Sequence, residues 1–276
     1  MFKEGVTSSD RQSGIRKLIA LYATRFKHTT GKDIKVLFTG RCCVNMVTGV
    51  IELPDVVGYK SEEDKKFKER MLIFGAQHEM GHLISTDLEA IEPWMNKVKG
   101  SKASAFLHQC INVFEDIREE HLFCGHFPGA GTEMRDFLSQ ECKRELSGRF
   151  RDPKCPMTKK LMDLSYVRGR SLQYEAYGLD PVDLKVPDDV EEAYQKTAAD
   201  LVVRASKTES QDEICKIAYE FYTRVKEESD KPSMPPLNVG DVVACGKEIG
   251  QVLSITGNDV EVEVITKEEA KKRLAS

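Results

Sequence analysis

The stretch that most constrains the fold is "FGAQHEMGHLISTD" (residues 74–87), which places His78 and His82 four residues apart in an apolar background. The surrounding pattern predicts one long helix over residues 61–85, with a serine cap and acidic residues in its first turn. Residues four apart share one face of a helix, so both imidazoles point to the same side. Because burying two unpartnered polar rings is costly, we expect the rest of the fold to bring a partner to this face.

Within this stretch, residues 78–82 ("HEMGH") form an HExxH pattern. In such a pattern His78 and His82 bind one zinc ion, and Glu79 lies beside its open position. Bound zinc lowers the pKa of a water molecule to about 7, and a neighbouring glutamate takes the proton as that water attacks a carbonyl carbon. The pattern therefore indicates a zinc site with Glu79 as general base.

A catalytic zinc site needs a third protein ligand, and the acids of "NVFEDIREE" are the best source. They lie on a second predicted helix over residues 101–122, with Asn112, Glu115 and Glu119 on one stripe and Asp116 beside it. We predict that Glu115 is the ligand and that Asp116 or Glu119 hydrogen-bonds the far nitrogen of a zinc histidine, with Asn112 as a further supporting residue. The alternative is a solvated acidic face with Arg118 as its partner. Other acids and histidines near the motif stay open as ligands: Asp87, Glu89, Glu92, His108 and His121.

The combination of "HEMGHLISTD" and "NVFEDIREE" resembles HExxH metallopeptidases of the gluzincin type. It is most similar to the CobT-like and von Willebrand-associated peptidases of bacteria and their phages. The resemblance covers about residues 34–120 and implies zinc on His78, His82 and Glu115, a base at Glu79 and support from Asp116. The strand ending in "VIELP" is similar to that family's edge strand, to which a peptide substrate adds. At residues 163–167, "DLSYV" lacks the second serine of a von Willebrand metal site, so we expect no such domain.

Zincins also need a group that stabilises the oxyanion, commonly a histidine, tyrosine or arginine. The chain offers Tyr174, Tyr177, His126 and Arg170 for this role. For each tyrosine, the alternative is a ring that packs against a neighbouring helix.

The remaining pattern predicts an α+β fold: a mainly helical, zincin-like domain with a small N-terminal sheet. An amphipathic helix is expected over residues 11–27, followed by a strand at 34–40 and a hairpin whose turn contains Thr48-Gly49. Further helices are expected over residues 133–147, 157–175 and 189–227.

The breaker run "KPSMPP" (residues 231–236) predicts a boundary between a metallopeptidase domain at 1–230 and a small β domain with a short tail at 231–276. After it, short β-branched stretches alternate with Gly-Lys and Gly-Asn turns, as in small SH3-like and KOW-like barrels. Such barrels bind RNA, peptides or a neighbouring domain, so a protein or RNA partner is expected at this end by analogy of fold alone.

Composition narrows the class of protein. The net charge is -4 and the pI is about 6.0, which argues against nucleic-acid binding through the whole surface. The eight cysteines form no CxxC pair, which favours reduced thiols. No secretory signal or apolar membrane span is evident. We therefore expect a cytoplasmic protein, in the host cytoplasm if a phage encodes it.

Two functions from different classes fit the sequence. The first is a zinc-dependent metallopeptidase that cuts peptide bonds in a protein or peptide substrate, without a membrane partner. The second is a non-catalytic, zinc-containing scaffold that uses its C-terminal barrel to engage protein or nucleic acid. Glu79 favours the enzyme, since a structural zinc site has no need of an unliganded carboxylate beside an open position.

Overall fold

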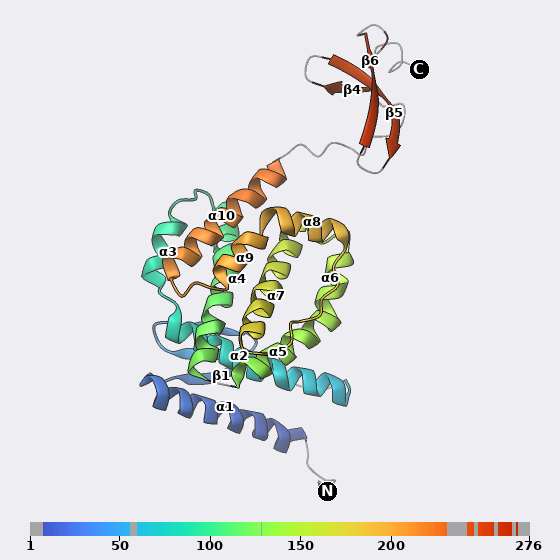
Figure 1. Cartoon of the computed structure of the whole chain (residues 1–276). Helices are drawn as coiled ribbons and strands as arrows, with labels where there is room; N and C mark the ends of the chain where they lie inside the picture. The colour runs from blue at the N-terminus through green and yellow to red at the C-terminus, as the bar shows by residue number, and fades with distance from the viewer. Residues whose placement is uncertain are drawn as a thin grey trace. The chain divides into compact units, whose positions relative to one another are not determined.

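The computed structural model describes residues 8–55, 60–127, 129–230, 242–245, 248–256, 259–266 and 269. The chain divides into two compact units, residues 1–226 and residues 227–276. This division falls close to the boundary predicted at residue 230. The first unit is mainly helical with one small sheet, and it contains the HExxH stretch (Figure 1).

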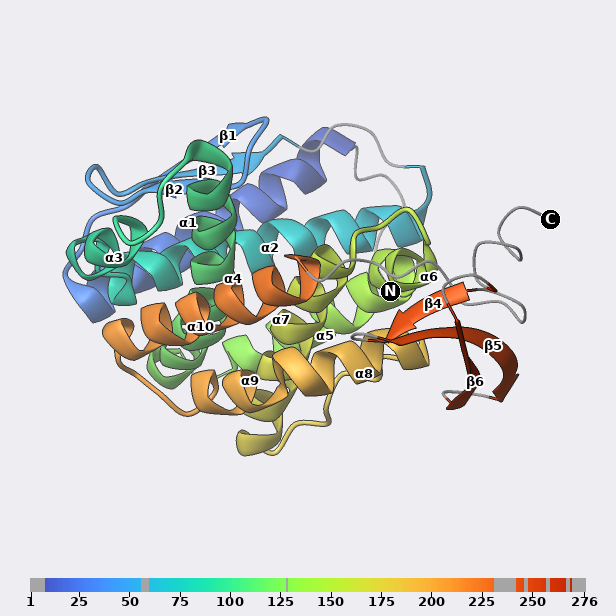
Figure 2. The same ribbon diagram turned by 90° about the horizontal axis from the view of Figure 1, so that it is seen from above.

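A long helix and a three-stranded sheet form the N-terminal part of the first unit (Figure 2). Helix α1 (Ser8–Thr30) is followed by β1 (Lys35–Thr39), β2 (Cys43–Asn45) and β3 (Val50–Pro54). Strands β2 and β3 form the predicted antiparallel hairpin. Its turn ends at Gly49, where φ is +65° and a side chain would meet the main-chain oxygen of Asp33 at 2.8 Å. Glycine is therefore required at that position.

The order of the strands corrects one expectation. Strand β3, which contains "VIELP", pairs in parallel with β1 and antiparallel with β2, so it is the central strand and not an edge. Its alternating pattern buries Ile51 and Leu53 against α2. Over residues 50–52 both sides of β3 are paired with neighbouring strands, so this part of the strand offers no free edge to a substrate strand.

Three long helices form the centre of the first unit: α2 (Glu62–Ser85), α4 (Ser101–His126) and α7 (Met157–Ala176). Helix α2 begins where predicted, with the Ser61 hydroxyl accepting from the main-chain N–H of Asp64. Helix α4 packs between α2 and α7. It runs antiparallel to α2, since Glu115 contacts Thr86 at the end of α2 while Glu120, further along α4, contacts His78. The acids of α4 are therefore laid along the histidine face of α2.

The remaining helices differ in detail from the prediction. A short helix that was not predicted, α3 (Leu88–Met95), is capped by the Asp87 carboxylate. The helix expected over 133–147 is α5 (Ala130–Glu141) followed by a π-helical turn, η1 (Cys142–Leu146), and α6 (Ser147–Arg151).

The long helix expected over residues 189–227 is three helices: α8 (Asp188–Thr197), α9 (Ala199–Ala205) and α10 (Gln211–Asp230). The last break has a local cause. Ser210 accepts from the main-chain N–H of Glu213 and so begins a new helix.

In the second unit, β4 (Val242–Cys245), β5 (Glu248–Thr256) and β6 (Asp259–Ile265) form an antiparallel sheet in that order. Closure of this sheet into an SH3-like barrel stays a prediction, and most of the predicted tail lies outside the described residues. Among the helices that the structure describes, none has the length and apolarity needed to cross a membrane.

Candidate metal centre

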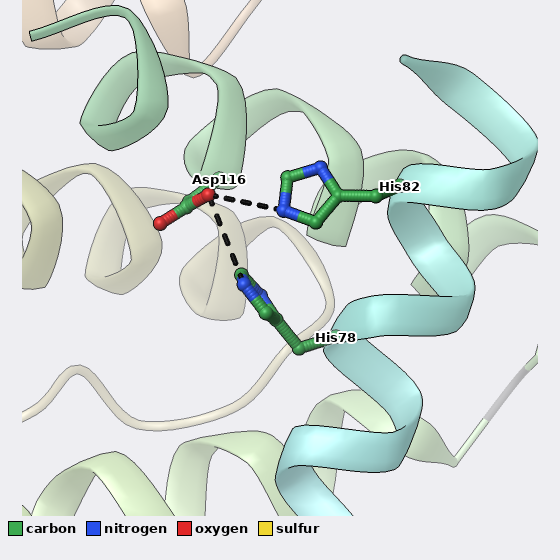
Figure 3. A group of neighbouring side chains, drawn as sticks. All are labelled: His78, His82 and Asp116. Atoms are coloured by element: carbon green, nitrogen blue, oxygen red, sulfur yellow. Dashed lines mark ion pairs between the residues drawn. The ribbon is translucent and has the colours of Figure 1, made fainter. Parts of the chain in front are cut away.

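The two histidines of α2 point toward one carboxylate of α4 (Figure 3). The Nε2 atoms of His78 and His82 lie 3.8 and 3.3 Å from Oδ1 of Asp116. Two ligands of one tetrahedral zinc ion are separated by about 3.4 Å, given bonds of about 2.1 Å. These three side chains therefore have the composition and spacing of a three-ligand metal site.

Hydrogen bonds on the far side of each ring show which nitrogen holds a proton. Nδ1 of His78 is 2.9 Å from the Glu120 carboxylate, which only accepts, so this nitrogen carries the proton. Nδ1 of His82 is 2.9 Å from the Thr86 hydroxyl, whose own proton goes to Glu115 at 2.6 Å. Thr86 must therefore accept from His82. Both rings therefore hold a proton on Nδ1 and direct Nε2 toward Asp116. A metal that displaces the proton from Nε2 meets the tautomer that binds it.

Glu115 is not brought to the histidine pair. Its carboxylate accepts from Thr86, from Gln211 at 2.8 Å and from two nitrogens of the buried Arg118 at 2.6 and 2.9 Å. The structure thus differs from the predicted ligand set: Asp116 faces the histidines, and Glu115 supports His82 through Thr86. The reason is geometric. Consecutive helical residues point about 100° apart, and the antiparallel register sets Glu115 opposite the end of α2.

Glu119 is the second carboxylate at the histidine pair. It is fully buried; its Oε1 pairs with Nδ1 of His78 at 2.9 Å, and its Oε2 has no hydrogen-bond partner. With Glu120 and His78 it forms another group of potential ligands. A buried carboxylate oxygen without a donor is costly, so the unpartnered Oε2 also favours a cation on this side of the site.

The charges around the histidines have the sign that a metal ion requires. Glu79, Asp116, Glu119 and Glu120 surround them, and the buried guanidinium of Arg170 contacts Glu120. Burial opposes a charge on His78, but Asp116 and Glu119 outweigh it and raise the pKa of His78 to about 9. In the absence of a metal, the site therefore binds protons more tightly than free histidine does. This is expected for an acidic cluster that a divalent cation would neutralise.

The glycine of "HEMGH" has a local explanation. A Cβ at position 81 would overlap the Glu119 carboxylate, so Gly81 allows α4 to bring this acid against α2. We expect Gly81→Ala to lower the free energy of unfolding by about 1–3 kcal/mol through overpacking. Urea unfolding in the presence of a chelator measures this without a contribution from metal.

Gly125→Ala is the matched control, because Gly125 is also helical but a Cβ at position 125 would meet no atom within 4 Å. It is expected to raise the free energy of unfolding by up to about 1 kcal/mol. Equal effects of the two substitutions would contradict the close approach of Glu119 to Gly81.

The predicted general base lies beside the ligands. Glu79 is almost fully buried, and its Oε1 accepts from the Cys42 thiol, with sulfur and oxygen 3.5 Å apart. Cys42 is exposed as a residue, but its sulfur lies against α2, near Gly75. Burial of the sulfur and the Glu79 charge raise the pKa of this thiol to about 12. Cys42 therefore remains a hydrogen-bond donor to Glu79.

A cleft of about 440 Å³ opens at His78 and Asp116. Its apolar wall contains a series of stacked rings: Phe74 lies 5.7 Å from His78 and 4.5 Å from Phe137, which lies 5.5 Å from Phe67. Tyr166 also lines the cleft, and its ring stacks on Arg170 at 3.9 Å. The charged side chains on the remaining wall are Glu141, Glu145, Arg149, Lys159 and Asp163.

The other predicted site residues lie elsewhere. Asn112 is exposed, and Tyr174 is buried with no hydrogen-bond partner for its hydroxyl. Tyr177 donates to the main-chain oxygen of His121, and His126 is an exposed residue at the end of α4. None of these four lines the cleft at His78 and Asp116.

No role was predicted for Thr86, Glu120, Tyr166 or Gln211, and Arg170 was predicted only as an oxyanion group. One signal was available for Glu120, since it follows Asp116 by four residues and so shares its face of α4.

Comparison with known proteins does not place this chain in a family. No protein-family model matches this chain, and no match was found among curated proteins or among solved structures.

Proposed function

We propose that this protein is a zinc-dependent metallopeptidase. The observation that carries the proposal is the pair of Nε2 atoms that face Asp116, together with a cleft that is lined by His78 and Asp116. Glu79 follows His78 directly in the chain. A structural zinc site would enclose its ion with protein ligands, whereas three ligands next to a cleft are typical of a catalytic site.

In this proposal, His78, His82 and Asp116 hold the ion, which when bound supplies Lewis acidity and lowers the pKa of a water molecule. Imidazole nitrogen and carboxylate oxygen are both common zinc ligands, so the donor set fits the metal. The unpartnered Oε2 of Glu119 and the excess of buried negative charge give independent support for a divalent cation.

The side chains of the chain itself supply the remaining chemistry. Glu79 accepts the proton of the attacking water and passes it to the leaving amine. Tyr166 is the phenol in the cleft that suits the role of donor to the developing oxyanion. Burial, together with the Asp116 charge, raises the pKa of Tyr166 well above its usual value, so the hydroxyl keeps its proton.

The wall of the cleft supports a peptide substrate with a bulky apolar side chain near the cut bond. Phe67, Phe74 and Phe137 form a continuous aromatic surface that begins at His78. An apolar side chain placed there would remove this surface from water at roughly 25 cal/mol per Å². A substrate with a small polar side chain at this position would gain no such free energy from the aromatic wall.

The proposal is tested by removing and restoring the metal. Purified protein is expected to contain about one zinc ion per chain by elemental analysis, as three ligands and one open position require. Dialysis against a chelator is expected to abolish cleavage of an unfolded protein substrate, and added zinc is expected to restore it. Mass spectrometry of the products shows whether the cut bonds adjoin large apolar residues.

Magnesium, added to the chelated protein, is the control, because its preference for oxygen ligands suits a two-histidine site poorly. Absence of bound metal would contradict the proposal outright. Zinc that is bound while no substrate is cut would favour the scaffold alternative instead.

A further inference from the structure

The C-terminal helix of the first unit reaches the candidate metal centre through one side chain. Gln211, the first residue of α10, donates from Nε2 to Oε2 of Glu115 at 2.8 Å. Its Oε1 accepts from Nη2 of Arg118 at 2.7 Å and from the main-chain N–H of Asp87 at 3.1 Å. One amide therefore joins α10, α4 and the segment just after α2.

Arg118 adds further hydrogen bonds between the same three segments. It is buried, and besides Glu115 it donates to the main-chain oxygens of Ser85 at 2.7 Å and Glu209 at 3.1 Å. The buried Glu115 and Arg118 and the half-buried Gln211 form a cluster, called the Glu115 junction below, in which both carboxylate oxygens of Glu115 are hydrogen-bonded. Charge-assisted bonds of this kind hold a carboxylate in one orientation.

The orientation of Glu115 determines what Thr86 does. Since the Thr86 hydroxyl donates to Glu115, its lone pair faces Nδ1 of His82. If Glu115 turned away, Thr86 would be free to donate its proton to Nδ1, and His82 would then place its own proton on Nε2. That tautomer presents no lone pair to a metal.

We propose that Gln211 is a positioning residue for the metal centre, acting on His82 through Glu115 and Thr86. The inference rests on the proposed function, because it requires that His82 bind a metal. It assigns the first turn of α10 a role in metal affinity, although Gln211 follows Glu115 by 96 residues. His78 has a comparable support on its other side, where Arg170 contacts Glu120.

The test is the zinc affinity of purified variants, measured by competition with a chromophoric chelator. Loss of a partner in the outer shell of a metal site costs about 10–100-fold in affinity, so Thr86→Val, which removes the direct partner of His82, is expected to fall in that range. Gln211→Ala acts one step further out and is expected to lose roughly 3–10-fold, at the lower end of such effects. The visible spectrum of the cobalt-substituted protein should shift in both variants, because it reports ligand geometry.

Two further variants separate positioning from stability. In the same turn of α10, Asp212 accepts a hydrogen bond from the Trp94 indole at 2.9 Å. Asp212→Ala removes this hydrogen bond and leaves Glu115 untouched. It is expected to keep wild-type zinc affinity and spectrum. Gln211→Glu keeps the size of the side chain but cannot donate to Glu115, so it should weaken zinc binding even if Gln211→Ala fails to fold.

Wild-type zinc affinity and an unshifted cobalt spectrum in Gln211→Glu would overturn the inference while leaving the metal site intact. Equal losses in Gln211→Glu and Asp212→Ala would also overturn it, since general loosening of α10 would then be the cause. A wild-type protein that binds no zinc would instead refute the proposed function itself.

Discussion

Glu79→Gln is expected to leave zinc bound and to lower the rate of peptide hydrolysis by about 10²–10⁴-fold, the range that a general base contributes. The amide has the size of the carboxylate and still accepts from the Cys42 thiol, so the packing at this position is retained. What it loses is the ability to take a proton. The measurement is kcat on a cleaved peptide, together with zinc content per chain.

Glu145→Gln is the matched control for this result. Glu145 lies on the wall of the same cleft, and the substitution makes the same change of charge away from the histidines. Its rate should stay close to that of the wild type. If Glu79→Gln loses its zinc, Glu79 is a ligand instead of a base; if it keeps its rate, another group takes the proton.

Local patterns of the sequence were sufficient to predict helix α2, which carries the two histidines, and the neighbouring hairpin. The spacing of His78 and His82 fixes their shared face, because it depends only on the geometry of α2. The hairpin of β2 and β3 was equally local, since its turn contains Gly49. Helix α2 began where predicted because Ser61 caps it.

Residues whose roles depend on the register between distant elements were not predictable in this way. Glu115 and Asp116 are neighbours, and only the antiparallel register of α2 and α4 decides which one faces the histidines. Strand β3 was expected at an edge from the family resemblance. Its parallel pairing with β1 follows no local signal in the sequence, so it was not predicted.

On helix α7, the sequence likewise did not predict which residue lines the cleft. Tyr166, Arg170 and Tyr174 follow one another at intervals of four and so share one stripe. The sequence indicated this stripe through Arg170 and Tyr174, but the position of the cleft selects Tyr166. The depth at which a helix meets a cavity depends on tertiary packing, which a single sequence does not specify.

The choice of third ligand gives the other large expected effect. Asp116→Ala should weaken zinc binding by more than the roughly 10–100-fold that loss of an outer-shell partner costs, because it removes a ligand atom itself. Glu115→Gln should fall within or below that range, since it weakens only the Glu115 junction. Zinc affinity by chelator competition compares the two variants directly.

Glu119→Gln completes the comparison, because Glu119 is the other carboxylate next to His78. The exchange keeps the volume that packs against Gly81 and removes one buried charge. If Asp116 is the ligand, Glu119→Gln should retain most of the zinc affinity. A larger loss in Glu119→Gln than in Asp116→Ala would transfer the ligand role to Glu119, and a dominant loss in Glu115→Gln would restore the assignment that the sequence alone suggests. In each case, the order of the three losses identifies which carboxylate of α4 holds the ion.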